Sequence, residues 1–182
     1  MVILIKMITI REYSEGDAES VGKLIADTYS QFNLAYLPPE EMKAFLGPFK
    51  HARSTEKSHQ DEIARMIRSE WVFVAEDDGE IVGVLRGRKK RLGSLFVRGD
   101  HHRKGIGRKL VERFEEECQK HAPMVIRVAA TMYGVPFYAA MGYKRSTGVR
   151  ASRSFEGHGL PVQPMRKVLK KGVELEPVFR NG

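Results

Sequence analysis

A basic, glycine-containing segment between residues 95 and 108 has the residue types that a phosphate-binding loop needs. It reads Leu-Phe-Val-Arg-Gly-Asp-His-His-Arg-Lys-Gly-Ile-Gly-Arg, so an apolar run ends and Gly105 and Gly107 open an amphipathic pattern. The first amides of a helix have no intrahelical partner and lie at the positive end of its dipole. Glycines leave such amides uncovered, so the segment predicts a cradle for a pyrophosphate. Three basic side chains add charge to it: Arg103, Lys104 and Arg108.

The two glycines do not by themselves decide the ligand. The segment matches neither G-x-G-x-x-G nor G-x-x-x-x-G-K-[ST]. Glycines at a helix start also let the helix pack closely against its strand, and the pair alone supports that interpretation equally well.

A second group of residues follows one predicted helix and one predicted strand later. Residues 134–143 read Gly-Val-Pro-Phe-Tyr-Ala-Ala-Met-Gly-Tyr, which predicts a short helix ended by Gly142. Tyr138 within it carries a phenol with an ordinary pKa of about 10. An aromatic side chain on such a helix is also typical of simple packing.

The loop resembles the acetyl-CoA-binding motif of the GNAT superfamily of N-acetyltransferases, whose phosphate loop reads R/Q-x-x-G-x-G/A. Gly105 and Gly107 stand at the glycine positions, and His102 stands where Arg or Gln is expected. The resemblance implies that the preceding strand holds the pantetheine arm and faces the acetyl carbonyl, while the loop holds the pyrophosphate. The cofactor-binding residues it implies are Leu95, Phe96, Val97, His102, Arg103, Lys104, Gly105, Ile106, Gly107 and Arg108.

Residues 134–143 resemble the F-Y-x-x-x-G-[FY] element of the same family, and two motifs in the right order are more specific than either alone. Tyr138 matches the family's general acid, which protonates the departing sulfur of coenzyme A, so it is the expected catalytic residue. The residues do not identify the general base that would take the proton of the amine. The strand expected over residues 92–97 has no acidic residue. The alternatives are Glu76 on an adjacent strand, the loop residues Asp100, His101 and His102, a water-relayed base or none.

The elements that position these motifs alternate between strands and helices. We expect strands over residues 7–13, 71–76, 81–86, 92–97, 125–129, 143–149 and 163–169, and helices over residues 14–29, 40–46, 61–69, 104–121 and 135–141. This order predicts one α/β domain of the α+β kind over residues 1–182. The resemblance implies a GNAT-like mixed, mostly antiparallel sheet of six to seven strands flanked by helices. Residues 1–6 are expected to form a disordered or extended overhang, and residues 170–182 a tail.

The amino-acid composition limits the class of protein and the cellular location that we expect. The chain has 182 residues, 42% of them hydrophobic and 30% charged, which is ordinary for a soluble globular protein. Cys118 is the only cysteine, so an intrachain disulfide and a cysteine-based zinc site are excluded, and a cytoplasmic location fits best. No metal is expected. The apolar run over residues 1–5 is too short to span a membrane.

The formal net charge of +8 favours anionic partners. Residues 86–91 read Arg-Gly-Arg-Lys-Lys-Arg, a run that suits a solvated turn, the 3′-phosphate of coenzyme A, an acidic substrate or nucleic acid. A nucleic-acid-binding module is therefore one alternative function, although the sequence shows no RRM, KH or zinc-finger pattern. A non-catalytic acyl-CoA sensor is another, because the acidic base is missing.

The main expectation is an acetyl-CoA-dependent N-acetyltransferase that works by direct transfer in a ternary complex. Its acceptor would be a primary amine on a small molecule, a peptide N-terminus or a lysine. Residues 33–69 and the chain after Gly148, the segments least like the family, are expected to select that amine. Family members are frequently homodimers, and nothing in this sequence marks an interface.

Overall fold

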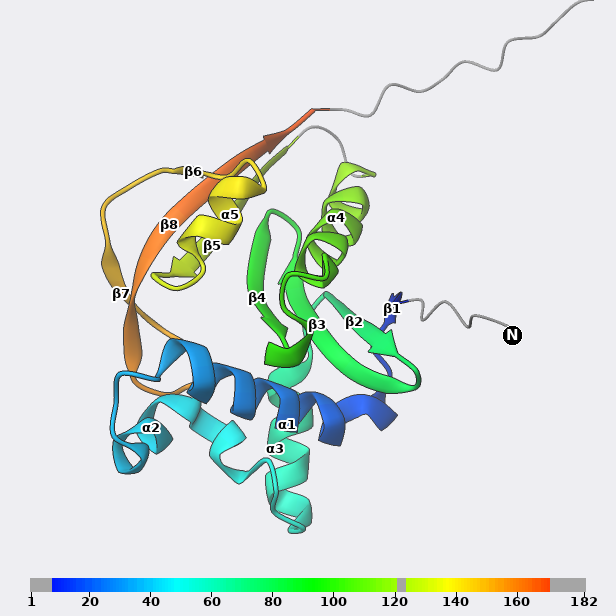
Figure 1. The fold of residues 1–182 in the computed structure, drawn as a ribbon, viewed down its shortest axis with the longest axis vertical. Coiled ribbons are helices and arrows are strands. Elements are labelled where there is room, and N and C mark those ends of the chain that lie inside the picture. The colour runs from blue at the N-terminus through cyan, green and yellow to red at the C-terminus, as the bar shows by residue number, and fades with distance from the viewer. Residues whose placement is uncertain (1–7, 121–123, 171–182) are drawn as a thin grey trace, which may run out of the picture.

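An eight-stranded mixed sheet forms the centre of the computed structural model, which describes residues 8–120 and 124–170. The strand order is β1-β2-β3-β4-β5-β8-β6, with β7 paired to β8 (Figure 1). In the described part of the chain β4 and β5 are parallel, and the other paired strands are antiparallel. The strands are β1 (Thr9–Glu12), β2 (Trp71–Asp77), β3 (Glu80–Arg88), β4 (Arg91–Val97), β5 (Met124–Thr131), β6 (Lys144–Arg145), β7 (Arg150–Arg153) and β8 (Gly159–Leu169). The expected mixed α/β fold is confirmed. The expected overhang, and the tail beyond residue 170, lie outside the described residues.

Helices cover both faces of the sheet. They are α1 (Ala18–Thr28), α2 (Pro39–Leu46), α3 (Lys57–Ile67), α4 (Ile106–Gln119) and α5 (Val135–Ala140). Side chains alternate between the faces of a strand, so Leu85 packs with α4 while its neighbour Val84 packs with α1 and α3. Two hydrophobic cores result, one under α4 and α5 and one under α1, α2 and α3 (Figure 1).

The hairpin of β2 and β3 forms where the sequence predicts it. Asp78 and Gly79 make its turn with φ of 55° and 81°. Two consecutive positive φ values match the right-handed twist of the strands, and Asp-Gly adopts them readily. The strands β1, β2, β3 and β4 then follow one another as antiparallel neighbours.

The strand expected over residues 143–149 shortens to the two residues of β6, and an unexpected strand, β7, follows. Proline in the partner strand explains the break. Pro164 of β8 lies opposite the break; its carbonyl accepts from the N–H of Ser146 at 3.0 Å, but it has no N–H to donate in return. The side chain of Gln163 replaces that donor, because its Nε2 donates to the carbonyl of Thr147 at 2.6 Å.

Candidate functional site

The sheet splits between its two parallel strands. β4 and β5 pair only through Arg91 with Arg127 and Leu92 with Val128, and then diverge. A cavity of about 720 Å³ occupies the split, and residues 93–97 and 128–131 line its opposite walls. That volume lies within the range of small-molecule sites.

Backbone groups of β4 face this cavity in a fixed alternation. The amide of Arg98 donates to the carbonyl of Val82 in β3 at 2.8 Å. In an antiparallel ladder every second residue bonds the partner, so the amide of Phe96 also faces β3. The N–H groups of Leu95 and Val97 therefore face the side from which β5 has diverged. Phe96 contributes its ring to the cavity wall.

A bulge at Gly93 begins this exposed stretch of β4. Arg86 pairs with Ser94 and Gly87 with Leu92, so Gly93 is the extra residue on β4. A Cβ on Gly93 would lie 3.1 Å from the carbonyl oxygen of Arg86, a tight approach that favours glycine. Bulges bend a strand and increase its twist, which fits the divergence from β5 that follows.

The predicted phosphate loop joins β4 to α4 and leaves the start of α4 open. Gly105 precedes the helix with φ of 78°, the left-handed region that favours glycine. A Cβ there would meet nothing within 4 Å, so the space in front of the helix is clear. Gly107 has another role, since a Cβ on it would lie 3.2 Å from the ring of Phe137. Gly105 therefore leaves the start of α4 uncovered, and Gly107 permits close packing against Phe137.

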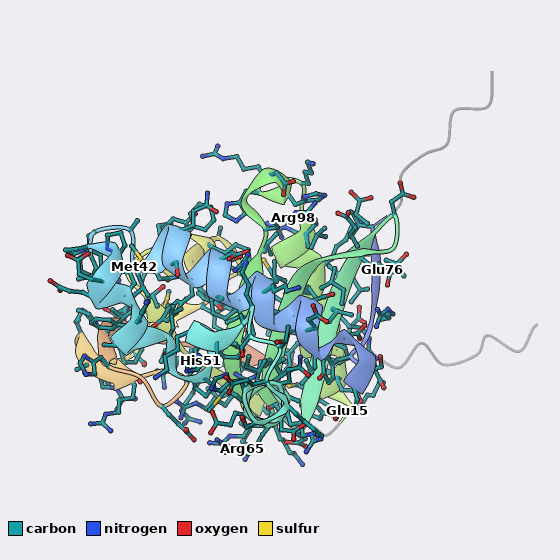
Figure 2. All side chains as sticks on the ribbon, turned by 90° about the horizontal axis from the view of Figure 1, so that it is seen from below. Glu15, Met42, His51, Arg65, Glu76 and Arg98 are labelled. Atoms are coloured by element: carbon teal, nitrogen blue, oxygen red, sulfur yellow. The ribbon has the colours of Figure 1, made fainter. Side chains whose placement is uncertain are left out.

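Charged groups anchor the loop. His101 is buried, and its Nε2 lies 2.9 Å from Asp77 while its Nδ1 lies 2.7 Å from Asp100. Arg98 reaches Asp100 at 2.8 Å and Glu80 at 3.0 Å. The Arg98 guanidinium, together with His101, holds the pKa of Asp100 well below its usual range. In Figure 2, Arg98 lies on the opposite side of α1 from Arg65 of α3.

His102 ties the loop to the end of β4. Its Nε2 donates to the carbonyl of Val97 at 2.7 Å, and its ring centroid lies 4.5 Å from that of Phe32. Phe32 also stacks on Tyr133 at 5.4 Å. The residue that departs from the family's Arg or Gln thus bonds to the strand backbone.

Tyr138 lies in α5 and lines the cavity while remaining buried. Its ring packs against those of Phe137 and Tyr143, with centroids 5.2 and 5.6 Å away. Burial raises the pKa of its phenol, so the group keeps its proton throughout the neutral range. The side chain is both a packing residue and part of the cavity wall.

Nine of the ten expected binding residues line the cavity; the exception, Lys104, is exposed. Among the described residues of the lining there is no Asp or Glu. Glu76, the alternative base on a neighbouring strand, lies outside the lining and bonds to Arg11 at 2.9 Å. Within residues 8–120 and 124–170, no cluster of three His, Cys, Asp or Glu side chains could hold a metal.

At the other end of the cavity, Asn33, Arg153 and Phe155 lie in the segments expected to select the amine, whereas Tyr29 and Arg86 lie outside them. The last turn of α1 widens into a π turn over Tyr29–Asn33, where Leu34 N–H bonds back to the carbonyl of Tyr29 at 3.1 Å. Asn33 Oδ1 accepts a bond from Thr131 Oγ1 at 2.6 Å, which bridges the split. Arg153 and Phe155 complete this end. The π turn breaks helical spacing without a glycine or proline, so no local signal marks it.

Two further features concern the single cysteine and the length of the helices. Cys118 is buried in α4, and burial raises its pKa to about 11, so it is a packing residue. No helix in the described ranges has the length and apolar character that crossing a membrane demands.

Comparison with known proteins agrees with this geometry. A family model described as "Acetyltransferase (GNAT) domain" matches residues 26–169. A GCN5-related N-acetyltransferase from Rhodopseudomonas palustris superposes with a TM-score of 0.71 at 17% identity, covering 93% of this chain and 100% of its own. PaiA N-acetyltransferase from Thermoplasma acidophilum, solved in complex with coenzyme A, gives 0.67 at 18%, covering 90% and 99%.

A third structure is yncA from Salmonella typhimurium, a putative acetyltransferase with its cofactor acetyl-CoA. It gives a TM-score of 0.58 at 16% identity, with 91% of this chain and 96% of its own covered. Comparison with curated proteins gives no match by sequence. The family match spans most of the chain, including the split sheet and the loop before α4, and this chain is therefore an acyltransferase of the GNAT acetyltransferase family.

Proposed function

We propose that this protein is an N-acetyltransferase that uses acetyl-CoA as co-substrate and acetylates a primary amine by direct attack in a ternary complex. The observation that carries the proposal is the split between β4 and β5, which opens beside the uncovered start of α4. The wall formed by β4 supplies unpaired strand amides, and the start of α4 supplies helix amides. A long ligand with phosphates at one end requires both.

The residues present fit the coenzyme. The open space before Gly105 and the first amides of α4 suit a pyrophosphate, with Arg103 and Arg108 adding charge. The N–H groups of Leu95 and Val97 suit the polar atoms of a pantetheine arm. Acetyl-CoA, when bound, supplies a thioester whose acetyl group is transferred.

The chain's own groups then have distinct tasks. An amide of β4 that faces the split donates to oxygen where negative charge develops, and a rigid strand holds it in place for this. Tyr138 Oη donates its proton to the departing sulfur. No carboxylate in the described lining can take the proton that the amine loses, so water carries this proton to the bulk solvent, and Tyr138 regains its own proton from water by the same route.

The experiment measures binding and turnover separately. Acetyl-CoA should raise the melting temperature, because a ligand that binds only the folded state stabilises it. Amine-dependent release of free thiol should follow in a screen of amines. Absence of both effects would contradict the proposal.

A non-catalytic acyl-CoA sensor is the second candidate, and the absence of Asp and Glu from the described lining favours it. It predicts the same thermal shift without amine-dependent thiol release. The turnover measurement therefore separates the two functions.

A further inference from the structure

On the face of the sheet opposite to α4 lies an arginine that has no carboxylate partner among residues 8–120 and 124–170. Arg86 lies in β3 two residues after Val84, so the two side chains share the face that packs against α1 and α3. Its Nε donates to the carbonyl of Ile67 at 2.7 Å, and its Nη2 donates to the carbonyl of Met66. These bonds cap the C-terminus of α3. Its Nη1 has no acceptor among the described residues, and Arg86 lines the cavity.

The charge of Arg86 is not balanced by the described part of the chain. Burial lowers its pKa to about 10, and no carboxylate offsets that shift. Buried charges in proteins are normally paired, because removing an ion from water is costly. Two carbonyls satisfy part of the guanidinium, but they carry no net charge. A ligand anion would supply the missing partner.

Two more polar groups adjoin this position. Ser94 is the cross-strand partner of Arg86, and its buried hydroxyl has no hydrogen-bond partner within the described ranges. Arg153 lines the cavity from β7 and is exposed. It forms no ion pair with any described residue. We call the end of the cavity near Asn33, Arg86, Arg153 and Phe155 the amine end. It combines two arginines and the hydroxyl of Ser94, and no described Asp or Glu lines it.

The loop beside Arg86 is held in a strained conformation. Phe155 has φ of 54°, and Arg86 Cζ lies 5.4 Å from the centroid of its ring. A Cβ on Gly47 would lie 1.7 Å from the carbonyl oxygen of Phe155, and one on Gly157 would lie 2.4 Å from that of Phe45. Close backbone contacts thus wedge the loop against the end of α2. Strain of this kind is typical of binding sites, where it fixes a side chain in place.

We infer that the acceptor amine carries an anionic group, a carboxylate or a phosphate, which Arg86 and Arg153 bind. The inference rests on the proposed function and names its substrate class. A guanidinium binds both anions through paired N–H groups. Arg103 and Arg108 lie at the start of α4 and serve the phosphates of the coenzyme instead. An acceptor with several positive charges fits poorly, since no Asp or Glu lines the described cavity.

The test on the substrate side uses matched pairs. Each α-amino acid is compared with its carboxamide, and 2-aminoethyl phosphate with 2-aminoethanol, by thiol release. The best anionic acceptor should exceed its neutral partner about tenfold or more in kcat/KM, as expected for a charged hydrogen bond. In the presence of coenzyme A it should also raise the melting temperature more than its partner does. The two pairs distinguish carboxylate from phosphate.

The test on the protein side uses Arg153→Gln and Arg86→Lys. Arg153 is exposed, so its loss should leave the fold and coenzyme affinity intact while reducing the preference for the anion about fivefold. Arg86→Lys keeps the charge but cannot form the same paired bonds, so the preference should also fall. Arg150→Gln removes the same charge from the opposite face of β7 and should change nothing.

The outcomes separate the two proposals. Transfer to neutral amines as efficiently as to anionic ones, or an anion preference unchanged in Arg153→Gln and Arg86→Lys, would overturn the inference and leave the acetyltransferase intact. Failure of acetyl-CoA to bind would overturn the proposed function itself. If Arg86→Lys unfolds because α3 loses its cap, Arg153→Gln and the substrate pairs on the unaltered protein still decide.

Discussion

The two ends of the cavity are built in different ways. The end that we propose for the coenzyme, here called the coenzyme end, is one continuous segment, residues 95–108, and it presents mainly backbone amides. The amine end is assembled from the π turn of α1, from β3 and from the β7–β8 loop, and it presents side chains. Coenzyme affinity should therefore resist side-chain changes and fail when the backbone is altered. Amine selectivity should show the reverse behaviour.

Tyr138→Phe should have the largest effect, because Tyr138 lies between the two ends and is assigned to the chemical step. Turnover should fall about 100-fold, the lower part of the range for loss of a general acid. Coenzyme affinity should change less than twofold by titration calorimetry. Tyr36→Phe, at an exposed position outside the cavity lining, is the matched control. An unchanged kcat would assign Tyr138 to packing alone.

The pH profile sharpens this test. Burial raises the pKa of Tyr138, so its proton is held more tightly in the folded protein than in the unfolded chain. Turnover should not decline through loss of this proton below about pH 10, the ordinary tyrosine pKa. The stability that the neutral phenol contributes is present below that pH and is lost as the pH rises above it. An alkaline decline near pH 8 that Tyr138→Phe abolishes would contradict the assignment.

Gly105→Val should be the most damaging change at the coenzyme end. A β-branched residue at φ of 78° is strained by about 1–2 kcal/mol, and its side chain enters the open space before α4. Coenzyme A should bind at least tenfold more weakly, measured by calorimetry. Gly148→Val introduces the same side chain where a Cβ also meets nothing and φ is not positive, so it serves as control. Equal affinities for the two variants would remove the cradle from the proposed site.

The same contrast explains how far the sequence could predict the site. The coenzyme end is local: a strand, a glycine with positive φ and an amphipathic helix leave their signals within one short window. The amine end depends on contacts between distant segments, such as Phe155 with Arg86, and no periodicity reports them. Arg86 had one usable signal, since it lies two residues after Val84 in a strand that is buried on both faces. Because Arg86 also begins the basic run of residues 86–91, the sequence supports equally well a place for it in the solvated turn that follows.

The fold itself was predictable where one element dictates its own structure. The β2–β3 hairpin and α4 follow from turn chemistry and apolar spacing. The β6–β7 region was not predictable, because its pairing depends on Pro164 in β8, a strand that comes later in the chain. The divergence of β4 from β5 likewise depends on a bulge whose position only the pairing with β3 reveals.

Thr131→Val tests whether binding of the amine can be weakened without a change in the affinity for coenzyme A. The change keeps the shape of the side chain and removes the hydrogen bond to Asn33. The lost bond should raise the KM for the amine about threefold while the affinity for coenzyme A stays constant. Thr147→Val, at an exposed position whose recorded bond uses only its backbone carbonyl, is the control. Weaker coenzyme binding in Thr131→Val would show that the two ends are not independent.

Substitutions of His102 should have the smallest effects on binding. They also separate the two ends most clearly, because the His102 ring contacts both. The bond from Nε2 to the carbonyl of Val97 serves the coenzyme end, and the contact with Phe32 serves the amine end. His102→Gln keeps a donor that can reach the same carbonyl, whereas His102→Leu does not. Coenzyme affinity should therefore fall about threefold in His102→Leu and less than twofold in His102→Gln. The KM for the amine should rise in both variants, since both lose the ring. If His102→Gln instead bound coenzyme A several-fold more tightly, the position would act on the phosphates directly, and the backbone account of the coenzyme end would need a side chain after all.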